Sequence, residues 1–383
     1  MTHHVVRFAC LLHSQYQAKN ILILYDCLGT LSEAVHEKLN TPELIALLMP
    51  PLMAKWNTVA DNSIDIFPLL ECLTAIAQAL RKGFFVFAEP VFGRCMHIIE
   101  TNLAAQREAE RIREAGGDWD DIDKEFIVCA LDLLSGLAEG LEESVEPLVG
   151  ADPGRFLGLL FHCAQDLDPD VRQSAFALLG DLAKTCMGHL RPHLSKFLPL
   201  AARNLNPHYF SVCNNASWCI GEIAVRAGAD AMAEHIGDVL HFLILILQQG
   251  DPDMMLALLE NASITVGRLA VIAPQHVAAA PLEGFILKWI TYLAPLKEHQ
   301  EKEHAFRGLI AALQVNPQAV LKVQGFPALT AAIASWQKPS HELNTLFGQL
   351  LHYYKQLLAN QWPMCWNSCA PDVKQILAAR YQL

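Results

Sequence analysis

Acidic residues recur at one register of the helical segments in this sequence. Asp26, Glu71 and Asp132 each stand three positions before a small residue and between apolar neighbours. Offsets of +1 and +4 from the small residue fall on the same helical face, and they add further carboxylates. The whole set comprises Asp26, Glu33, Glu71, Asp132, Glu139, Asp181 and Glu222. Carboxylates aligned on one surface attract and steer basic partners, so this register predicts a binding surface for a cationic chain.

The same register changes character further along the chain. Trp218 and Ile264 occupy it, and Asn214 and Asn215 lie about one turn before Trp218 in "SVCNNASWCIGEIA". A tryptophan in an apolar helix is usually part of the core, and asparagines near a helix start are usually caps. The shared register favours a different interpretation, in which these side chains face outward and contact a peptide backbone or a basic side chain. A separate buried stripe is predicted at Val212, Ala216, Cys219, Ile220 and Ile223.

No motif typical of catalysis or of metal binding stands out. Cys365 and Cys369 could suggest a metal, but no second Cys or His pair lies at zinc spacing, so two core thiols are favoured. The run "HQEKEHAF" lacks the His-Glu-x-x-His order of zinc proteases, and there is no phosphate-binding glycine loop or nucleophile elbow. We therefore predict a protein that is not an enzyme and that uses no cofactor and no metal.

The small residues that define the register recur at a regular interval. These anchors are Gly29, Thr74, Ser135, Gly180, Gly221, Gly267 and Ala311. Successive anchors stand 41 to 46 residues apart, except for 61 residues between Thr74 and Ser135. Helix-pair solenoids of the HEAT or armadillo kind repeat at about 40–47 residues. Because packed helices approach closely only where side chains are short, the anchored helices are predicted to form one layer.

A second amphipathic helix is predicted between consecutive anchors, for example over 44–56 and 235–249. Turn signals such as "GDPD" at 250–253 separate it from the next anchored helix. The sequence therefore predicts an all-α, HEAT-repeat superhelical solenoid of about eight helix pairs over 1–383. A charged, glycine-containing loop insertion near 104–125 explains the one long interval.

Composition limits the classes of partner. Hydrophobic residues make up 52 % and charged residues 18 % of the 383 residues, which is typical of a well-buried globular chain. The formal net charge of −12 disfavours nucleic acid and anionic membrane as partners and favours basic ones. The eleven cysteines are scattered singly, as expected in a reducing compartment. The start lacks a secretory signal, and the apolar run at 239–247 is too short to span a membrane.

Several blocks of sequence resemble the transportins, import receptors of the karyopherin-β family. The blocks run in order over essentially the whole chain and include "NILILYDCLGTL", "LMPPLMAKWN", "ALDLLSGLAEGLEE", "LNPHYFSVCNNASWCIGEI" and "AFRGLIAALQVNP". The resemblance covers the C-terminal half of a transportin. It implies a HEAT superhelix that binds proline-tyrosine nuclear localisation signals of cargo proteins, often RNA-binding proteins, and that shuttles between cytoplasm and nucleus through the nuclear pore.

The resemblance also implies a set of cargo-contacting residues. Those that receive the signal's basic stretch would be Asp26, Glu33 and Glu71. Those that receive its N-terminal basic or hydrophobic motif would be Val128, Asp132, Glu139, Asp181, Phe210, Asn214, Asn215, Trp218 and Ile264. Val128 and Phe210 depart modestly from the family, in which we expect isoleucine.

Other parts of the transportin pattern have no counterpart in this sequence. The Ran-binding repeats and the acidic loop that couples Ran to cargo release are absent, and the pocket for the proline-tyrosine pair lies before residue 1. We therefore expect binding of only part of a signal and no release by the GTPase Ran, although nucleoporins remain candidate partners. The alternative is a HEAT scaffold subunit that holds folded proteins, which would more naturally use the turns along one edge.

Overall fold

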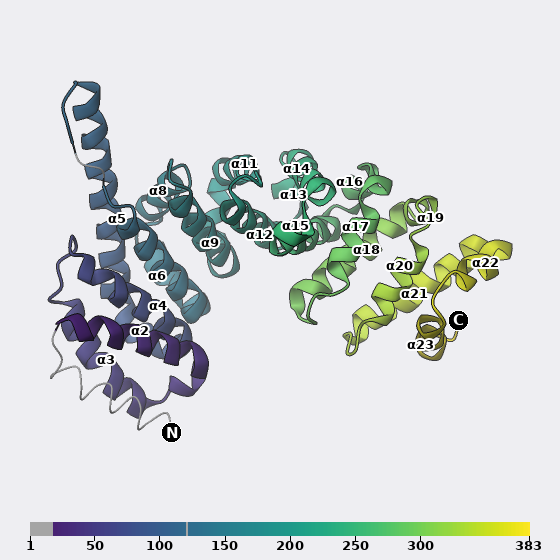
Figure 1. Cartoon of the computed structure of the whole chain (residues 1–383), viewed down its shortest axis with the longest axis horizontal. Helices are drawn as coiled ribbons and strands as arrows, with labels where there is room; N and C mark the ends of the chain where they lie inside the picture. Colours follow the sequence, from purple (N-terminus) through teal and green to yellow (C-terminus); the bar gives the residue numbers. More distant parts are fainter. Residues whose placement is uncertain (1–17, 120–121) are drawn as a thin grey trace. The chain divides into compact units, whose positions relative to one another are not determined.

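The computed structural model describes residues 18–119 and 122–383, and every regular element in that part of the chain is a helix (Figure 1). This confirms the predicted all-α fold. The described residues form two compact units, 1–193 and 194–383, and each is treated separately below. One continuous solenoid over 1–383 stays a prediction.

In the first unit, the anchored helices pack side by side in chain order. They are α2 (Ala18–Val35), α4 (Phe67–Leu80), α6 (Glu125–Leu141) and α9 (Pro169–Thr185), and each contacts the next (Figure 1). The helices between them form a second layer: α3 (Pro42–Trp56), α5 (Phe85–Glu114), α7 (Glu146–Ala151), α8 (Pro153–Cys163) and α10 (Met187–Leu190). The predicted alternation of two helix layers is confirmed within this unit.

The second unit repeats the arrangement. Its anchored helices are α12 (Phe210–Ala227), α15 (Pro252–Ile272) and α18 (Gln300–Val315), and α21 (His341–Leu358) packs against α18 as the next in the stack. The remaining helices are α11 (Leu194–Arg203), α13 (Ala229–Met232), α14 (Ile236–Gln249), α16 (Pro274–Ala279), α17 (Ile286–Leu293), α19 (Gln318–Lys322), α20 (Phe326–Ala334), α22 (Trp362–Asn367) and α23 (Pro371–Tyr381). The buried stripe predicted for α12 is buried as expected.

Caps and turns set where the anchored helices begin and end. The Asp251 side chain accepts a hydrogen bond from the Asp253 backbone N–H and starts α15, which is the capping role that the "GDPD" signal predicts. At the other end, Arg81 after α4 and Glu142 after α6 both adopt positive φ, 51° and 53°. Their side chains form an ion pair at 2.8 Å. Equivalent turns in neighbouring repeats therefore share one backbone geometry.

Small residues allow the anchored helices of the second unit to touch through their backbones. A methyl group at Gly221 would lie 2.8 Å from the Thr265 hydroxyl oxygen of α15. A methyl group at Gly267 would overlap the backbone of Ala305 in α18. Gly29 in the first unit is less constrained, because its nearest neighbour would be the Cys72 Cα at 3.8 Å. The predicted role of the anchors holds most strictly for α12, α15 and α18.

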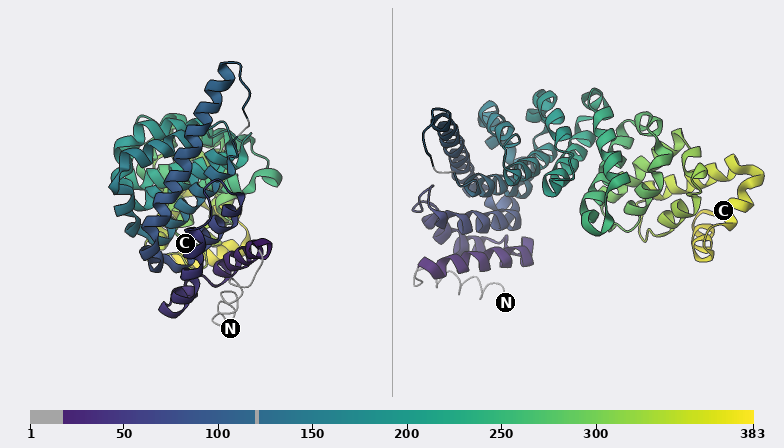
Figure 2. Two further views of the ribbon diagram at one scale, coloured as in Figure 1. Left: turned by 90° about the vertical axis from the view of Figure 1, so that its left-hand side faces the viewer. Right: turned by 45° about the horizontal axis from the view of Figure 1, so that its top comes forward.

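The charged insertion is only partly a loop. Residues 104–114 continue α5, so the prediction of a loop over 104–125 is wrong for its first half; residues 120–121 lie outside the described part. Figures 1 and 2 show α5 running well past its neighbours. Lys124, just before α6, ties the end of the insertion back to the unit through an ion pair with buried Asp166 at 2.7 Å.

Most cysteines are buried single thiols, as predicted. Among those described, only Cys27 is exposed and Cys365 half-buried; Cys10 lies outside the described residues. One segment, Met255–Ile272 of α15, is long and apolar enough to cross a membrane, although no such segment was predicted. Because 61 % of that segment is buried among other helices, it has the character of a core helix.

Candidate functional site

Exposed carboxylates of the first unit lie on three successive anchored helices. Asp26 is on α2, Glu71 on α4 and Asp132 on α6, and all three side chains are exposed. Glu125, one turn before Val128 on α6, joins them: ligand atoms of Glu71, Glu125 and Cys129 lie within 4.8 Å of one another. The structure thus places three of the predicted acidic residues near one another together with Glu125, and these four are here called the acidic cluster: Asp26, Glu71, Glu125 and Asp132.

The members of the acidic cluster repel one another. Desolvation raises the pKa of the Glu71 carboxyl, and nearby carboxylates raise it further. Those neighbours are Glu125, Asp26 and Asp132. Desolvation also raises the pKa of the Asp132 carboxyl, whereas a hydrogen bond with Ser174 lowers it by a smaller amount. Within residues 18–119 and 122–383, no lysine or arginine forms an ion pair with Asp26, Glu71 or Asp132, so the cluster lacks an internal counter-charge.

Other predicted acidic positions already have partners. Asp181 on α9 is 7 % exposed, and its carboxylate accepts hydrogen bonds from the Ser135 hydroxyl at 2.6 Å and the Lys184 ammonium at 3.1 Å. Burial nevertheless raises the pKa of Asp181. Glu139 on α6 is exposed but accepts from the Gln78 amide at 2.7 Å. The prediction that Asp181 belongs to an open acidic surface is therefore wrong for this conformation.

The remaining predicted positions of this unit, Val128 and Glu33, differ in exposure. Val128 on α6 is half-buried, and Glu33 at the end of α2 is exposed. The thiol of Cys129 donates to Glu125 at 3.3 Å, and burial raises its pKa, so it stays protonated at neutral pH. The carboxylates of Glu71 and Glu125 and the thiol of Cys129 lie within 4.8 Å of one another, which is close enough for one metal ion.

In the second unit, the amide side chains bridge α12 and α15. Asn214 and Asn215 are half-buried, and the Asn261 amide of α15 donates to the Asn214 side-chain oxygen at 2.8 Å. A weaker bond of 3.4 Å joins Asn214 to Asn215. Phe210, the first residue of α12, is 36 % exposed. These asparagines are therefore neither helix caps nor fully open to solvent.

Trp218 is half-buried and extends across the stack. Its indole N–H donates to the Glu301 carboxylate of α18 at 3.3 Å, although α15 lies between α12 and α18 in the layer. Ile264, at the matching register of α15, is only 4 % exposed. The prediction of outward-facing side chains holds partly for Trp218 and is wrong for Ile264, whose side chain is buried.

Beneath Trp218 lies a buried ionic network. Arg268 of α15 pairs with Glu301 at 2.9 Å and with Glu222 of α12 at 2.7 Å, and the latter also pairs with Arg226. The side chains of Arg268 and Glu222 are 3 % and 2 % exposed. Glu222, expected on the acidic surface from its offset, is instead a core residue whose charge is neutralised.

Sequence reasoning missed three residues of these surfaces: Glu125, Asn261 and Glu301. Glu125 stands seven residues before Asp132, and Asn261 three before Ile264, so both lie on the predicted face. Extending the register by one or two turns toward the helix start would have found them. Glu301, at the first turn of α18, would have been found in the same way.

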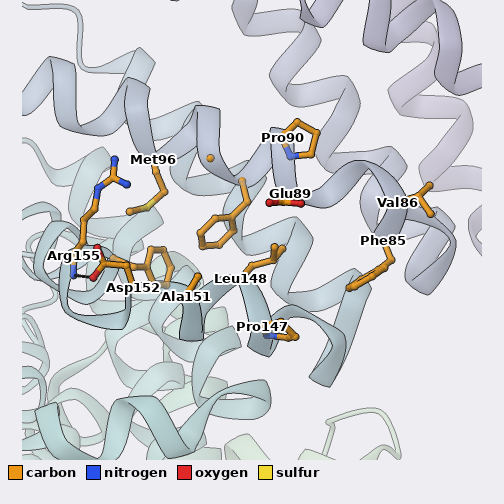
Figure 3. Close-up of a pocket in the computed structure, with 13 residues that line it drawn as sticks. Phe85, Val86, Glu89, Pro90, Met96, Pro147, Leu148, Ala151, Asp152 and Arg155 are labelled. Atoms are coloured by element: carbon orange, nitrogen blue, oxygen red, sulfur yellow. Dashed lines mark hydrogen bonds between the residues drawn. The ribbon is translucent and has the colours of Figure 1, made fainter.

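A pocket of about 700 Å³ lies away from these residues, in the second layer of the first unit. Figure 3 shows it between α5 and the α7–α8 segment, with Phe85, Val86, Pro90, Leu148 and Met96 along its walls. Phe85 and Val86 are 48 % and 75 % exposed. Arg155 at one end is held by Glu100 of α5, and the pocket is otherwise mainly apolar.

Comparison with curated proteins finds close relatives over almost the whole chain, whereas no family model matches. Transportin-1 of Homo sapiens is 44 % identical over 369 residues, covering 96 % of this chain and 40 % of the relative. Transportin-1 of Oryza sativa subsp. japonica is 42 % identical over 371 residues, covering 95 % and 40 %. Importin subunit beta-2 of Schizosaccharomyces pombe is 37 % identical over 372 residues, covering 96 % and 39 %. The chain thus spans about two-fifths of the length of these relatives.

Solved structures agree on the fold. Importin beta superposes with a TM-score of 0.53 at 15 % identity, covering 98 % of this chain and 48 % of that one. Kap121p bound to the extreme C-terminus of the phosphatase Cdc14p superposes with a TM-score of 0.55 at 13 % sequence identity, covering 95 % of this chain and 35 % of that one. Kap121p bound to Nup53p superposes with a TM-score of 0.54 at 15 % sequence identity, covering 96 % of this chain and 35 % of that one. At such identities these structures support the karyopherin type of helical solenoid and no more.

Proposed function

This chain is a homologue of the transportins, and from that premise we propose that it binds basic nuclear localisation signals of the proline-tyrosine type through the acidic cluster and the Trp218 surface. The names of the relatives given above, transportin and importin, are those of transport proteins. On this proposal the chain acts in nuclear import and shuttles between cytoplasm and nucleus.

The observation that carries the proposal is that the Glu71 carboxylate lies near other carboxylates and forms no ion pair with the described residues. Burial raises the pKa of the Glu71 carboxyl, three neighbouring carboxylates raise it further, and the described residues supply no ion pair to relieve them. A lysine or arginine of an extended peptide would supply the missing counter-charge. Since both the cluster and the peptide are partly solvated, each pair should contribute about 0.2–1 kcal/mol and weaken with salt. Affinity then depends on several such pairs along the peptide.

The Trp218 surface would add a different kind of contact. A half-buried indole offers a rigid apolar face, and a basic side chain stacked on it gains about 0.5–2 kcal/mol. The side-chain amides of Asn214 and Asn215 can form hydrogen bonds with the backbone of a bound peptide once these bonds replace their present hydrogen bonds with neighbouring amides. Ile264 is only 4 % exposed and offers a ligand little surface in this structure.

The test is titration of a fluorescein-labelled basic signal peptide into the purified chain at low and moderate salt. Glu71→Gln and Asp132→Asn should each weaken binding about two- to fivefold at low salt. Glu43→Gln serves as the matched control, because Glu43 is an exposed carboxylate of the second-layer helix α3. Equal affinities of all four proteins would contradict the proposal, as would the absence of binding by a folded wild-type chain.

We also propose that the α5–α8 pocket receives an apolar side chain of a second partner class, of which nucleoporins are the leading candidate. The supporting observation is the exposure of Phe85 and Val86 beside a mainly apolar cavity. Val86→Asp should abolish binding of a nucleoporin fragment and leave signal-peptide affinity unchanged. We propose no binding of Ran to this chain, because the resemblance implies Ran-binding repeats that lie outside this sequence.

A further inference from the structure

Glu301 has no role in the predicted set of cargo-contacting residues, yet it fixes the position of Trp218. Its Oε1 accepts from the Trp218 indole N–H at 3.3 Å and from Arg268 at 2.9 Å. Glu301 lies in the first turn of α18, whose N-terminal end is capped by the side chain of His299. A buried arginine therefore holds the carboxylate, and the carboxylate in turn holds the edge of the indole.

Charge and exposure differ within this network. The side chains of Arg268 and Glu222 are almost completely buried, whereas that of Glu301 is 34 % exposed. A ligand approaching Trp218 therefore meets the carboxylate of Glu301 and not the guanidinium of Arg268 beneath it. An aromatic face with a fixed carboxylate at its edge is suited to a planar cation, because the cation can stack on the ring and pair with the acid together.

We propose that Glu301 is a specificity-determining residue of the Trp218 surface and selects an arginine in the bound peptide. This inference deepens the proposed function and rests on it. The arginine guanidinium would stack on the Trp218 indole while one of its N–H groups donates to Glu301. Lysine fits less well, since its ammonium is a point charge that cannot lie flat on the ring.

The experiment replaces each arginine of a basic signal peptide in turn by citrulline, which keeps the shape and removes the charge. Affinities are measured for the wild-type chain, Glu301→Gln and Glu303→Gln. Glu303 is the matched control, since it lies on the same helical turn and is already paired with Arg307 and Ser340. The wild type should lose about three- to tenfold in affinity at one peptide position.

At that position Glu301→Gln should show little preference for arginine over citrulline, while Glu303→Gln keeps the wild-type preference. Glu301→Asp retains the negative charge and should keep part of the preference for arginine over citrulline. A partial preference in this variant separates a role of the charge in selecting arginine from a purely structural role of the side chain. If Glu301→Gln fails to fold, the Glu301→Asp scan still decides. An unchanged arginine preference in Glu301→Gln overturns the inference while the proposed function stands. A folded wild-type chain that binds no peptide overturns both.

Discussion

The backbones of Gly267 in α15 and Gly308 in α18 are in direct contact, so that a methyl group on Gly308 would overlap the Gly267 carbonyl oxygen. Two glycines facing each other remove both side chains from the interface. The helices of this part of the second unit are consequently packed backbone to backbone. This close approach also explains why the register of Gly308, acidic in the first unit, is fully buried here.

Gly308→Ala is therefore expected to be strongly destabilising. The added methyl meets rigid backbone and has to push α18 away from α15, which should cost about 2–3 kcal/mol in the free energy of unfolding. Urea denaturation followed by circular dichroism measures it. Gly237→Ala in α14 is the control, because a methyl there has no atom within 4 Å and should be neutral or slightly stabilising. Equal unfolding midpoints for the two variants would refute the close contact.

Glu71→Gln should stabilise the fold at neutral pH. The folded state raises the pKa of Glu71, so the ionised carboxyl opposes folding once the pH exceeds its ordinary value of 4.5. The penalty is absent below the unfolded pKa, grows as the pH rises from the unfolded to the raised folded pKa, and is constant above it. Because Glu71 is exposed, we expect a gain of only about 1 °C in melting temperature at pH 7 and none at pH 3.5. A thermal melt series of wild type and variant across this range decides it.

Trp218→Ala should weaken binding of a basic signal peptide about tenfold, because it removes the stacking face. Fluorescence anisotropy with a labelled peptide measures the affinity, and a thermal melt verifies that the variant is folded. Trp119→Ala provides the comparison, since Trp119 is 46 % exposed and lies in the insertion of the first unit. If both tryptophan variants bind as the wild type does, the Trp218 surface is not a peptide site.

Arg268→Met should destabilise the second unit by about 3–5 kcal/mol, since Glu222 would keep a buried charge with only the partly exposed Arg226 beside it. The double variant Glu222→Gln, Arg268→Met removes both buried charges and should recover much of the loss. Chemical denaturation of the two single variants and the double variant gives the coupling between the residues. Purely additive effects would argue against the direct ion pair.

The register of the anchors could be predicted from sequence because it follows from helical periodicity and small residues alone. It correctly places Asp26, Glu71 and Asp132 on exposed faces of successive helices. The same register could not predict the burial of Ile264, because burial depends on how closely α15 packs against its neighbouring helices. Nor could it predict that the Trp218 indole donates across α15 to Glu301, because the pairing of two residues 83 positions apart is set by how the helices pack.

Charge in the sequence was also a poor guide to charge on the surface. Glu222 and Asp181 share the favourable offset with exposed acids, yet Arg268 and Lys184 neutralise them inside the units. Whether a carboxylate stays open depends on which cation the next helix brings beside it. That information lies in the packing of repeats and not within any one of them.

The long helix α5 gives the molecule a natural attachment point. Gly116 and Asp118, which follow the end of α5 at Glu114, are exposed, and Figure 2 shows the end of α5 projecting beyond the neighbouring helices. A peptide tag or a fluorescent protein inserted after Asp118 would leave both helix layers of the first unit intact. Such a fusion would let the intact chain be followed in living cells without competing for the surfaces described above.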